Sequence, residues 1–329
     1  MSNVRFLTEA DVDSLVGMDD ALEAVERALL AVEHGEGSNA PRVRTSTGVT
    51  RLNLLGGMLQ SDGGRGYIGA KTYVTGSGAA KFWGMLFDQS GALLSLYEAD
   101  RVGQLRTGAA SGISARALAA SGARKMAMIG AGYQSLTQVE AIVRAAGLEE
   151  VAIFSRTYDK AVATAVVLSA RLGVKVQAVQ SLEEALENAG IVATMTNSKQ
   201  PVLDISHLRP GVHYVFAGSN NPANAEAAPD LLGAIDHVFT DDIEQAKREG
   251  GTLIRAAEAG CLEWTDVRTL GSALRGEYRR IDPSATTAFV SQGVGSWDTA
   301  LAATLYRRAV SQGVGAITQI NGEPVEGRR

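Results

Sequence analysis

The feature that most constrains the fold is a short apolar strand that runs into a glycine-rich turn and then a helix. Met126–Ile129 is apolar, and Gly130-Ala-Gly132-Tyr-Gln-Ser135 follows it and opens a helical segment. The pattern G-x-G-x-x-small is typical of a dinucleotide-binding turn, in which the first glycine permits the turn and the second admits a pyrophosphate. Free N–H groups at the helix N-terminus favour phosphate binding. We expect Gly130 and Gly132 to bind a dinucleotide; a purely structural turn is the alternative.

Strands alternate with helices for the next hundred residues. Expected strands at 151–154, 174–179, 191–195, 214–217 and 237–240 are interspersed with helices at 135–146, at 157–172 and after Ser181. This alternation indicates βαβ units and a doubly wound parallel sheet, the Rossmann arrangement.

The N-terminal part reads differently. A helix is expected from Asp19 to about Gly35, and β-like runs at 51–55, 67–74, 82–87 and 93–97 are separated by glycine-rich turns. Such spacing predicts a mostly antiparallel meander. The predicted fold class is therefore α/β: an α+β domain at 1–122, a Rossmann domain at 123–312, and a segment at 313–329 that packs back on the first domain.

Composition excludes several classes. The chain has 329 residues, a net charge of −5 and no evident basic face, so nucleic acid is not an expected partner. No apolar run approaches the roughly 20 residues of a membrane helix, and the first residues lack a signal-peptide pattern. One cysteine and four scattered histidines give no metal-ligand spacing. We therefore expect a cytoplasmic protein with no membrane contact and no metal site.

The second Rossmann strand is followed by Ser155-Arg156-Thr157. NAD-preferring sites usually place a carboxylate there for the ribose hydroxyl, but the first carboxylate is Asp159. The guanidinium of Arg156 suits a 2′-phosphate instead. NADP(H) is therefore slightly favoured as cofactor; in the alternative, Arg156 is solvated and the cofactor is NAD(H).

Three cations in the N-terminal half lie beside turn residues or small residues: Arg42, Lys71 and Arg106. Two arginines suit a substrate carboxylate, and neighbouring positive charge would lower the pKa of a lysine enough for acid–base work near neutrality. The spacing alone leaves open that all three are ordinary surface cations.

Several motifs together resemble the ornithine cyclodeaminase/mu-crystallin family. Arg106-Thr-Gly-Ala-Ala-Ser111 precedes the glycine-rich turn by about twenty residues. The other matching motifs are Gly69-Ala-Lys71, Leu86-Phe-Asp88 with Ser90-Gly91, Pro201-Val-Leu203, Leu208-Arg-Pro-Gly211, Ala217-Gly-Ser219, and Phe289-Val-Ser-Gln-Gly293 leading to Asp298. The resemblance extends from about residue 20 to about residue 315.

The resemblance implies a homodimer with a discontinuous substrate/dimerisation domain and a nicotinamide cofactor. It implies that Arg42 and Arg106 bind the substrate carboxylate and that Lys71 is the catalytic or orienting cation, with Arg106 also counted in the catalytic set. The implied cofactor contacts, beside the two glycines, are Thr107, Tyr133, Gln134, Ser155, Arg156, Thr157, Thr196, Ala217, Gly218, Ser219 and Ser291. For the small residues among them, a turn or packing role is the alternative.

One position departs from the family pattern. Cyclodeaminases of the family carry a catalytic aspartate where this chain has Asn220, so we count Asn220 in the catalytic set, with a turn role before Pro222 as the alternative; an amide cannot serve as a base. We therefore expect an oxidoreductase that reduces the C=N bond of a small α-imino or ketimine acid, or runs the reverse oxidation. A cyclodeaminase with internally recycled NAD and a non-catalytic NADPH-binding protein are the alternatives. Tyr73, Lys81 and Trp83 either line the substrate pocket or belong to the core or a dimer interface.

Overall fold

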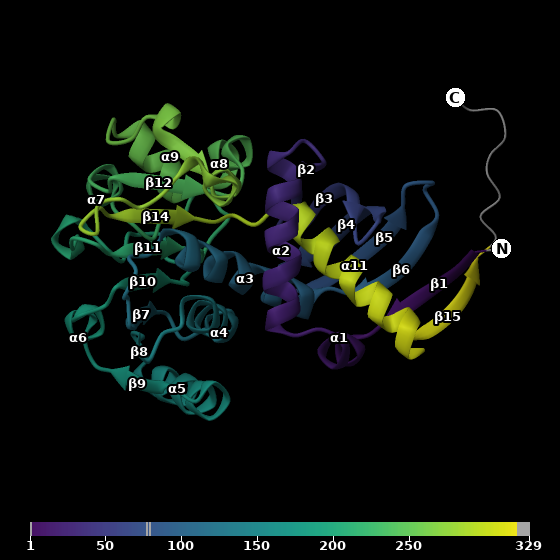
Figure 1. Cartoon of the computed structure of the whole chain (residues 1–329), viewed down its shortest axis with the longest axis horizontal. Helices are drawn as coiled ribbons and strands as arrows, with labels where there is room; N and C mark the ends of the chain where they lie inside the picture. Colours follow the sequence, from purple (N-terminus) through teal and green to yellow (C-terminus); the bar gives the residue numbers. More distant parts are fainter. Residues whose placement is uncertain (1, 77, 79, 321–329) are drawn as a thin grey trace. The chain divides into compact units, whose positions relative to one another are not determined.

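The computed structural model describes residues 2–76, 78 and 80–320, which form two compact units (Figure 1). The first unit holds the described residues up to Arg106 and those from Val294 on, and the second holds Thr107–Gly293. The first boundary falls inside helix α3 (Asp100–Leu118), and the second directly precedes helix α11 (Gly295–Gln312).

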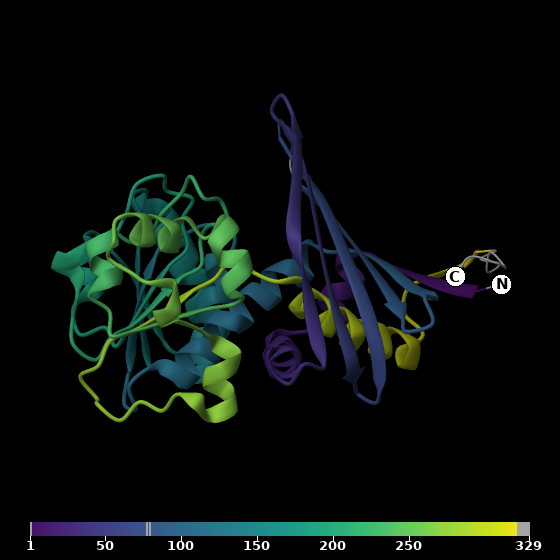
Figure 2. The same ribbon diagram turned by 90° about the horizontal axis from the view of Figure 1, so that it is seen from above.

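The first unit is built on a seven-stranded sheet in the order β15-β1-β6-β5-β4-β3-β2. Its strands are β1 (Ser2–Leu7), β2 (Gly37–Thr47), β3 (Thr50–Asp62), β4 (Arg65–Thr75), β5 (Lys81–Asp88), β6 (Leu93–Glu98) and β15 (Ala316–Ile320). Neighbours pair antiparallel except β1 with β6, and the β2–β3 hairpin projects beyond its neighbours (Figure 2). Beside α11, the helices are α1 (Glu9–Leu15) and α2 (Met18–Glu33).

Helix α11 lies directly on the central strands, and α2 lies across the same side of the sheet (Figure 1). Glycines make this close approach possible. A Cβ on Gly57 of β3 would come within 2.3 Å of the Ser296 backbone nitrogen, and one on Gly69 of β4 within 2.2 Å of Thr299 Oγ1. The first turn of α11 is thereby held against the middle of β3 and β4.

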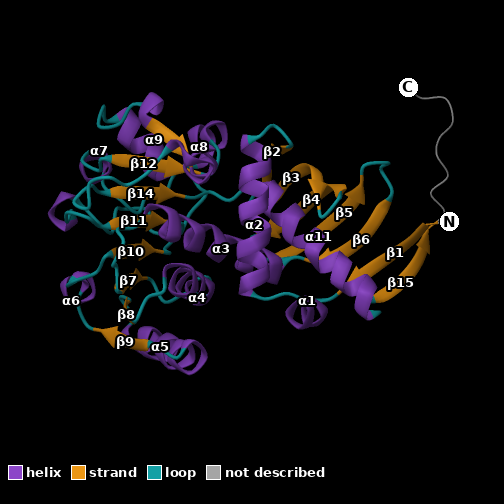
Figure 3. Ribbon diagram, in the orientation of Figure 1, coloured by secondary structure: helices purple, strands orange, loops and turns teal. Residues whose placement is uncertain are grey.

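The second unit is an eight-stranded sheet in the order β13-β12-β14-β11-β10-β7-β8-β9, in which every pair is parallel. Its strands are β7 (Lys125–Ile129), β8 (Glu150–Phe154), β9 (Lys175–Val179), β10 (Ile191–Thr194), β11 (His213–Phe216), β12 (His237–Thr240), β13 (Val267–Thr269) and β14 (Thr287–Val290). The helices that alternate with them (Figure 3) are α4 (Ser135–Ala146), α5 (Tyr158–Leu172), α6 (Leu182–Leu186), α7 (Pro229–Gly233), α8 (Ile243–Glu249), α9 (Gly251–Glu258) and α10 (Leu270–Ser272).

The predicted fold class is confirmed, with corrected boundaries. The structure divides the chain differently from the expected domains 1–122, 123–312 and 313–329. Its first unit breaks off after Arg106 and resumes at Val294, and the residues between them form the second unit. The range expected for the Rossmann domain includes helix α11, although the sequence leaves its packing on either domain open; α11 packs on β3 and β4, because its small residues meet the strand glycines. The described part of the segment after α11 pairs with the first unit, as β15 on β1, and residues 321–329 of the expected segment lie outside the described residues.

None of the helices in the described residues is long and apolar enough to cross a membrane. The cytoplasmic location stays a prediction.

Replacing Gly57 with alanine tests the close packing of α11 on β3. The added methyl group meets backbone atoms, which cannot rotate away, so Gly57→Ala should lower the free energy of unfolding by about 3 kcal/mol in urea titrations. Gly17→Ala, at a position with no atom within 4 Å, should cost less than about 1 kcal/mol. Equal stabilities of the two variants would contradict the packing.

Candidate functional site

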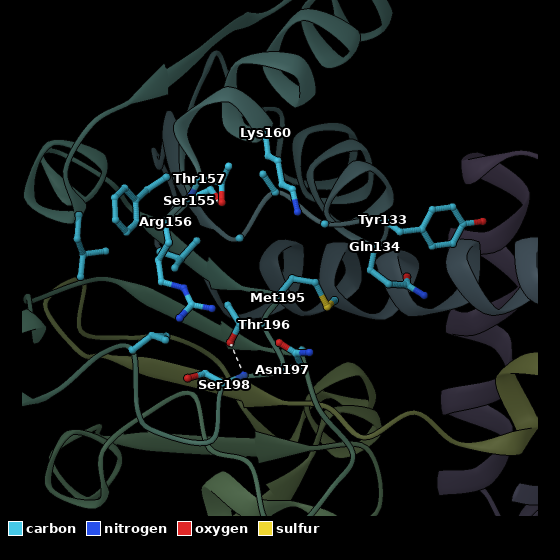
Figure 4. A pocket seen from close by; sticks show the side chains of 18 of the residues that line it. Tyr133, Gln134, Ser155, Arg156, Thr157, Lys160, Met195, Thr196, Asn197 and Ser198 are labelled. Atoms are coloured by element: carbon cyan, nitrogen blue, oxygen red, sulfur yellow. Dashed lines mark hydrogen bonds between the residues drawn. The ribbon is translucent and has the colours of Figure 1, made fainter. Parts of the chain in front are cut away.

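A cavity of about 720 Å³ opens at the carboxyl ends of β7, β8 and β10 in the second unit (Figure 4). This edge of a doubly wound sheet is where ligands bind in such folds. The cavity contains most of the predicted cofactor residues: Gly130, Gly132, Tyr133, Gln134, Ser155, Arg156, Thr157, Thr196 and Gly218.

The glycine-rich turn has the geometry that its sequence predicts. Gly130 adopts φ +111°, and a Cβ there would lie 2.5 Å from the Met195 carbonyl oxygen. Both the backbone conformation and the lack of space therefore exclude a side chain at this position. Gly132 faces open space, with no atom within 4 Å of a built Cβ. Ser135, fully buried at the start of α4, donates its hydroxyl to the Gly132 carbonyl. The N-terminus of α4 therefore borders an open cradle that fits a pyrophosphate.

Two cations extend towards the cavity from the end of β8 and the first turn of α5 (Figure 4). They are Arg156 and Lys160, and the lining residues in the described part of the chain include no aspartate or glutamate. Asp159, the first carboxylate after β8, is exposed and does not line the cavity. The charge at this corner suits an additional phosphate.

A buried carboxylate, which the sequence analysis did not single out, ties two walls of the cavity together. Glu226 is 2% exposed and accepts hydrogen bonds from the Thr196 backbone N–H (2.7 Å), the Thr196 hydroxyl (2.8 Å) and the Gly218 N–H (2.8 Å). Burial raises the pKa of Glu226, and the N–H donors of Gly218 and Thr196 oppose that rise. A Cβ on Gly218 would lie 2.2 Å from the Thr196 nitrogen, so only glycine permits this contact.

The remaining predicted cofactor residues lie in the second unit but do not line the cavity. They are Thr107, Ala217, Ser219 and Ser291. The Thr107 carbonyl accepts from Gln138, the Ser219 hydroxyl accepts from Asn224, and the buried Ser291 hydroxyl donates to Asp241. Asn220 is half-buried in the loop after β11, also outside the cavity. Their functional roles stay predictions.

The three predicted cations lie together in the first unit, around a carboxylate. Lys71 on β4 donates from Nζ to Asp298 Oδ1 at 2.9 Å, and Arg106 Nε lies 3.3 Å from Asp298 Oδ2. Both Lys71 and Asp298 are about 4% exposed, and Arg42 on β2 is 8% exposed. The alternative of ordinary surface cations is therefore wrong. We call these four residues the cation cluster.

Burial sets the protonation behaviour of the cation cluster. It lowers the pKa of Lys71; the Asp298 charge opposes this fall, and the charges of Arg106 and Arg42 add to it. For Asp298, burial alone would raise the pKa, but Arg106 and Lys71 outweigh it and hold the pKa below its usual value. The carboxylate therefore stays ionised beside a lysine that releases its proton more readily than a solvated one.

One glycine makes room for the lysine of the cation cluster, and another makes room for the ring of Tyr97. A Cβ on Gly103 of α3 would lie 2.5 Å from Lys71 Nζ, and one on Gly84 of β5 would lie 2.1 Å from the ring of buried Tyr97. Gly103 is a candidate that sequence reasoning missed, and Asp298 entered the sequence analysis as the end of a matching motif without a role of its own. The available signal for Asp298 was a lone carboxylate in the apolar, small-residue start of α11.

The cation cluster carries more positive than negative charge in a buried place, which suits a small anion. Arg106 Nε and Asp298 Oδ2 make no hydrogen bond with any residue in the described part of the chain. A carboxylate that accepted from the arginines would compensate the excess charge, and Lys71 would be left to exchange a proton.

Removing the carboxylate of the cation cluster should expose its electrostatic cost. Asp298→Asn leaves a buried cation unpaired beside two arginines and should lower the free energy of unfolding by about 3 kcal/mol at neutral pH. In the variant, the folded-state pKa of Lys71 falls further below its unfolded value, so the folded form gains stability as the pH rises. The difference in free energy of unfolding between the variant and the wild-type protein should therefore narrow with increasing pH. Urea titrations at several pH values measure both effects.

The matched control is Asp13→Asn, which removes an exposed partner of Arg101 and should cost less than about 1 kcal/mol at every pH. A deficit of Asp298→Asn that stays constant or widens with pH would contradict the assigned electrostatics.

Comparisons with known proteins identify relatives that cover most of the chain. An alanine dehydrogenase of Archaeoglobus fulgidus is 29% identical over 94% of this chain and 96% of its own length. A Delta(1)-pyrroline-2-carboxylate reductase of Bacillus cereus is 32% identical over 70% of this chain and 72% of its own. An iminosuccinate reductase of Paracoccus denitrificans is 27% identical over 95% of this chain and 99% of its own.

Solved structures extend the similarity to the whole fold. An archaeal alanine dehydrogenase dimer with bound NAD superposes with a TM-score of 0.89 at 27% identity, covering 97% of this chain and all of that one. The Paracoccus iminosuccinate reductase with NAD+ gives 0.88 at 25% identity, with the same coverage. The family model for the ornithine cyclodeaminase/mu-crystallin family matches residues 3–313. This chain therefore belongs to the ornithine cyclodeaminase/mu-crystallin family.

Proposed function

We propose that this protein is an NAD(P)H-dependent oxidoreductase that reduces the C=N bond of a small α-imino or ketimine carboxylic acid, or oxidises the corresponding amino acid. The observation that carries the proposal is the cation cluster, in which two buried arginines lie near a lysine of lowered pKa. The named relatives are reductases or dehydrogenases of imino and amino acids.

The chemistry divides between cofactor and protein. A bound reduced nicotinamide supplies the hydride that adds to the imine carbon. Arg42 and Arg106 hold the substrate carboxylate and so orient the C=N bond. Lys71 Nζ gives a proton to the nitrogen as the C–N π bond becomes the lone pair, and the ionised Asp298 fixes the ammonium before transfer. In the oxidative direction, the neutral lysine takes that proton back.

The cyclodeaminase alternative is disfavoured by Asn220, because displacement of ammonia by a side-chain amine needs a base and an amide provides none. The non-catalytic alternative is disfavoured by the cation cluster, since a protein that only stores cofactor gains nothing from burying three cations around one carboxylate.

A cofactor-oxidation assay distinguishes the three functions. Purified protein should oxidise NADPH or NADH with a 2-oxo acid plus ammonium or methylamine, or with pyrroline-2-carboxylate. Arg106→Ala should lower kcat/KM on the order of 100-fold and change the Kd for NADPH by less than about twofold. Ammonia release from ornithine without net cofactor change would favour the cyclodeaminase. Cofactor binding without turnover would favour the non-catalytic protein.

For the cofactor, we propose NADP(H) over NAD(H), although the related structures contain NAD or NAD+. The support is the pair Arg156 and Lys160 beside a cavity wall without carboxylates. Arg156→Asp should lower the ratio of kcat/KM for NADPH to that for NADH roughly 100-fold, by losing a charge-assisted pair and adding a repulsive charge.

Lys160→Ala should lower the same ratio by less. Arg124 directly precedes β7, at the amino ends of the strands, whereas the cavity lies at their carboxyl ends, so Arg124→Asp should leave the ratio unchanged. An unchanged ratio in Arg156→Asp would remove the 2′-phosphate assignment.

We further propose a homodimer formed through the sheet of the first unit. Val43, Leu54, Thr72 and Trp83 lie directly opposite one another across β2 to β5, on the face away from the Lys71 side chain. Val43, Leu54 and Trp83 are 62%, 46% and 39% exposed, and we call this surface the open sheet face. Contiguous exposed apolar surface of this kind marks an interaction site.

Light scattering after gel filtration tests the dimer. The wild-type protein should be dimeric, and Leu54→Glu should be monomeric because a charge would be buried in the interface. Val166→Glu, which places the same charge on an exposed apolar position of α5, should remain dimeric. A monomeric wild-type protein, or a dimer in Leu54→Glu, would contradict the assignment.

A further inference from the structure

A buried tyrosine shares the sheet face and the cross-strand row of Lys71. Lys71 on β4 pairs with Gly84 on β5, and Gly84 pairs with Tyr97 on β6. Residues that lie directly opposite one another in antiparallel strands project from the same face of the sheet. Tyr97, which is 1% exposed, therefore lies two strands away from the lysine on the face where the cation cluster is built.

The glycine between the two side chains allows the phenol to lean towards the lysine. A Cβ on Gly84 would lie 2.1 Å from Tyr97 Cζ and 2.5 Å from the Tyr97 hydroxyl oxygen. The hydroxyl end of the ring therefore occupies the space that a side chain on β5 would fill. Because opposite residues of neighbouring strands have Cβ atoms about 5 Å apart, this end of the ring lies beside the Lys71 side chain.

The hydroxyl of Tyr97 has no partner within the protein. Among the hydrogen bonds that the described residues form, none involves this hydroxyl. A buried hydroxyl that has lost its water and found no acceptor is costly, so nearly all such groups in proteins are hydrogen-bonded. A donor left open beside the cation cluster indicates that a bound molecule supplies the acceptor.

The surroundings keep the Tyr97 hydroxyl protonated. Burial raises the pKa of Tyr97, and the negative charge of Asp298 raises it further. Lys71, by contrast, has a lowered pKa and is the better acid of the two. Tyr97 is therefore a neutral O–H donor beside charged side chains, which suits it to binding an anion and not to releasing a proton.

We propose that Tyr97 is a substrate-binding residue whose hydroxyl donates a hydrogen bond to the α-carboxylate held by Arg42 and Arg106. The inference rests on the function proposed above. The imine nitrogen receives the proton of Lys71, which leaves the carboxylate as the acceptor for Tyr97. A carboxylate has about four acceptor positions, so it can accept from guanidinium groups and a hydroxyl at once. The added contact fixes the plane of the carboxylate and, through it, the C=N bond.

Tyr97→Phe tests the inference, because it removes the hydroxyl and keeps the ring. In assays of NADPH or NADH oxidation with pyrroline-2-carboxylate, or with pyruvate plus ammonium, KM should rise roughly 10- to 100-fold, as expected for loss of a hydrogen bond to a charged acceptor. The contact is the same in the ground and transition states, so kcat should change less than about threefold. The urea midpoint without ligands should not fall, because no hydrogen bond within the protein is lost.

Tyr67→Phe is the matched control. Tyr67 is also 1% exposed, but its hydroxyl accepts a hydrogen bond from Arg307. It lies four residues before Lys71 on β4, a distance of about 13 Å along the strand. This variant should lower the urea midpoint and leave KM within about twofold of the wild-type value. The two substitutions therefore remove the same atom and should give opposite patterns.

A binding measurement tests the contact without turnover. Calorimetric titration with pyrrole-2-carboxylate, a planar carboxylic acid without a C=N bond, is carried out in the presence of NADP+ or NAD+. Its Kd should rise in Tyr97→Phe by about the same factor as KM and stay at the wild-type value in Tyr67→Phe.

The outcomes separate this inference from the proposed function. An unchanged KM and Kd in Tyr97→Phe, equal losses in Tyr67→Phe, or a wild-type protein that does not bind pyrrole-2-carboxylate would overturn the role of Tyr97. A fall in kcat with an unchanged KM would make Tyr97 a proton donor and would overturn it as well. Absence of turnover by the wild-type protein with every 2-oxo acid and with pyrroline-2-carboxylate would overturn the proposed function, and the titration would then decide the role of Tyr97.

Discussion

The buried ion pair between Lys71 and Asp298 is the interaction on which the first unit is organised. Each partner is costly to bury alone. Strands β3 and β4, the start of α11 and the start of α3 must therefore meet at fixed distances. Glycines at the crossing points allow this: Gly57 and Gly69 admit α11, and Gly103 admits the lysine itself. Packing and chemistry thus constrain the same few positions.

The second unit solves a different problem, since it must hold an open cradle rather than a filled core. Gly130 turns the chain with a positive φ, and Gly132 leaves space in front of α4. Glu226 holds the ends of β10 and β11 at a fixed separation by accepting hydrogen bonds from both. Among the described residues, none of its hydrogen-bond donors is a cationic side chain. Rigid walls around an open space are what precise placement of a cofactor requires.

Local patterns in the sequence were sufficient for the Rossmann part. The helix expected at 135–146 has those bounds as α4, and the expected strands match β8 to β12 within a residue or two, because each is a short apolar run bounded by turn residues. Strand β2 was missed because Ser38-Asn-Ala-Pro-Arg42 is polar and contains proline. The assignment of α11 failed because its partner strands lie more than two hundred residues away in the chain.

The candidate sites show the same division. Motif resemblance grouped Arg42, Lys71 and Arg106 and included Asp298 in a motif, whereas the ion pairs that join Asp298 to Lys71 and Arg106 emerge only from the packing of α11 on β3 and β4. Of residues 72–83, Tyr73 shares the face of Lys71, but Trp83 lies opposite Thr72 on the other face. Strand register decides such questions, and a one-residue change would reverse every assignment.

The most direct test of the account is the pH dependence of kcat/KM for imine reduction in the wild-type protein and in Asp298→Asn. If Lys71 is the proton donor, the rate falls as the pH rises through its folded-state pKa, which lies below the ordinary lysine value of 10.5. Loss of the Asp298 charge lowers that pKa further, so the alkaline limb should move to lower pH. A limb that stays in place or moves to higher pH would contradict the assignment of Lys71 as the acid.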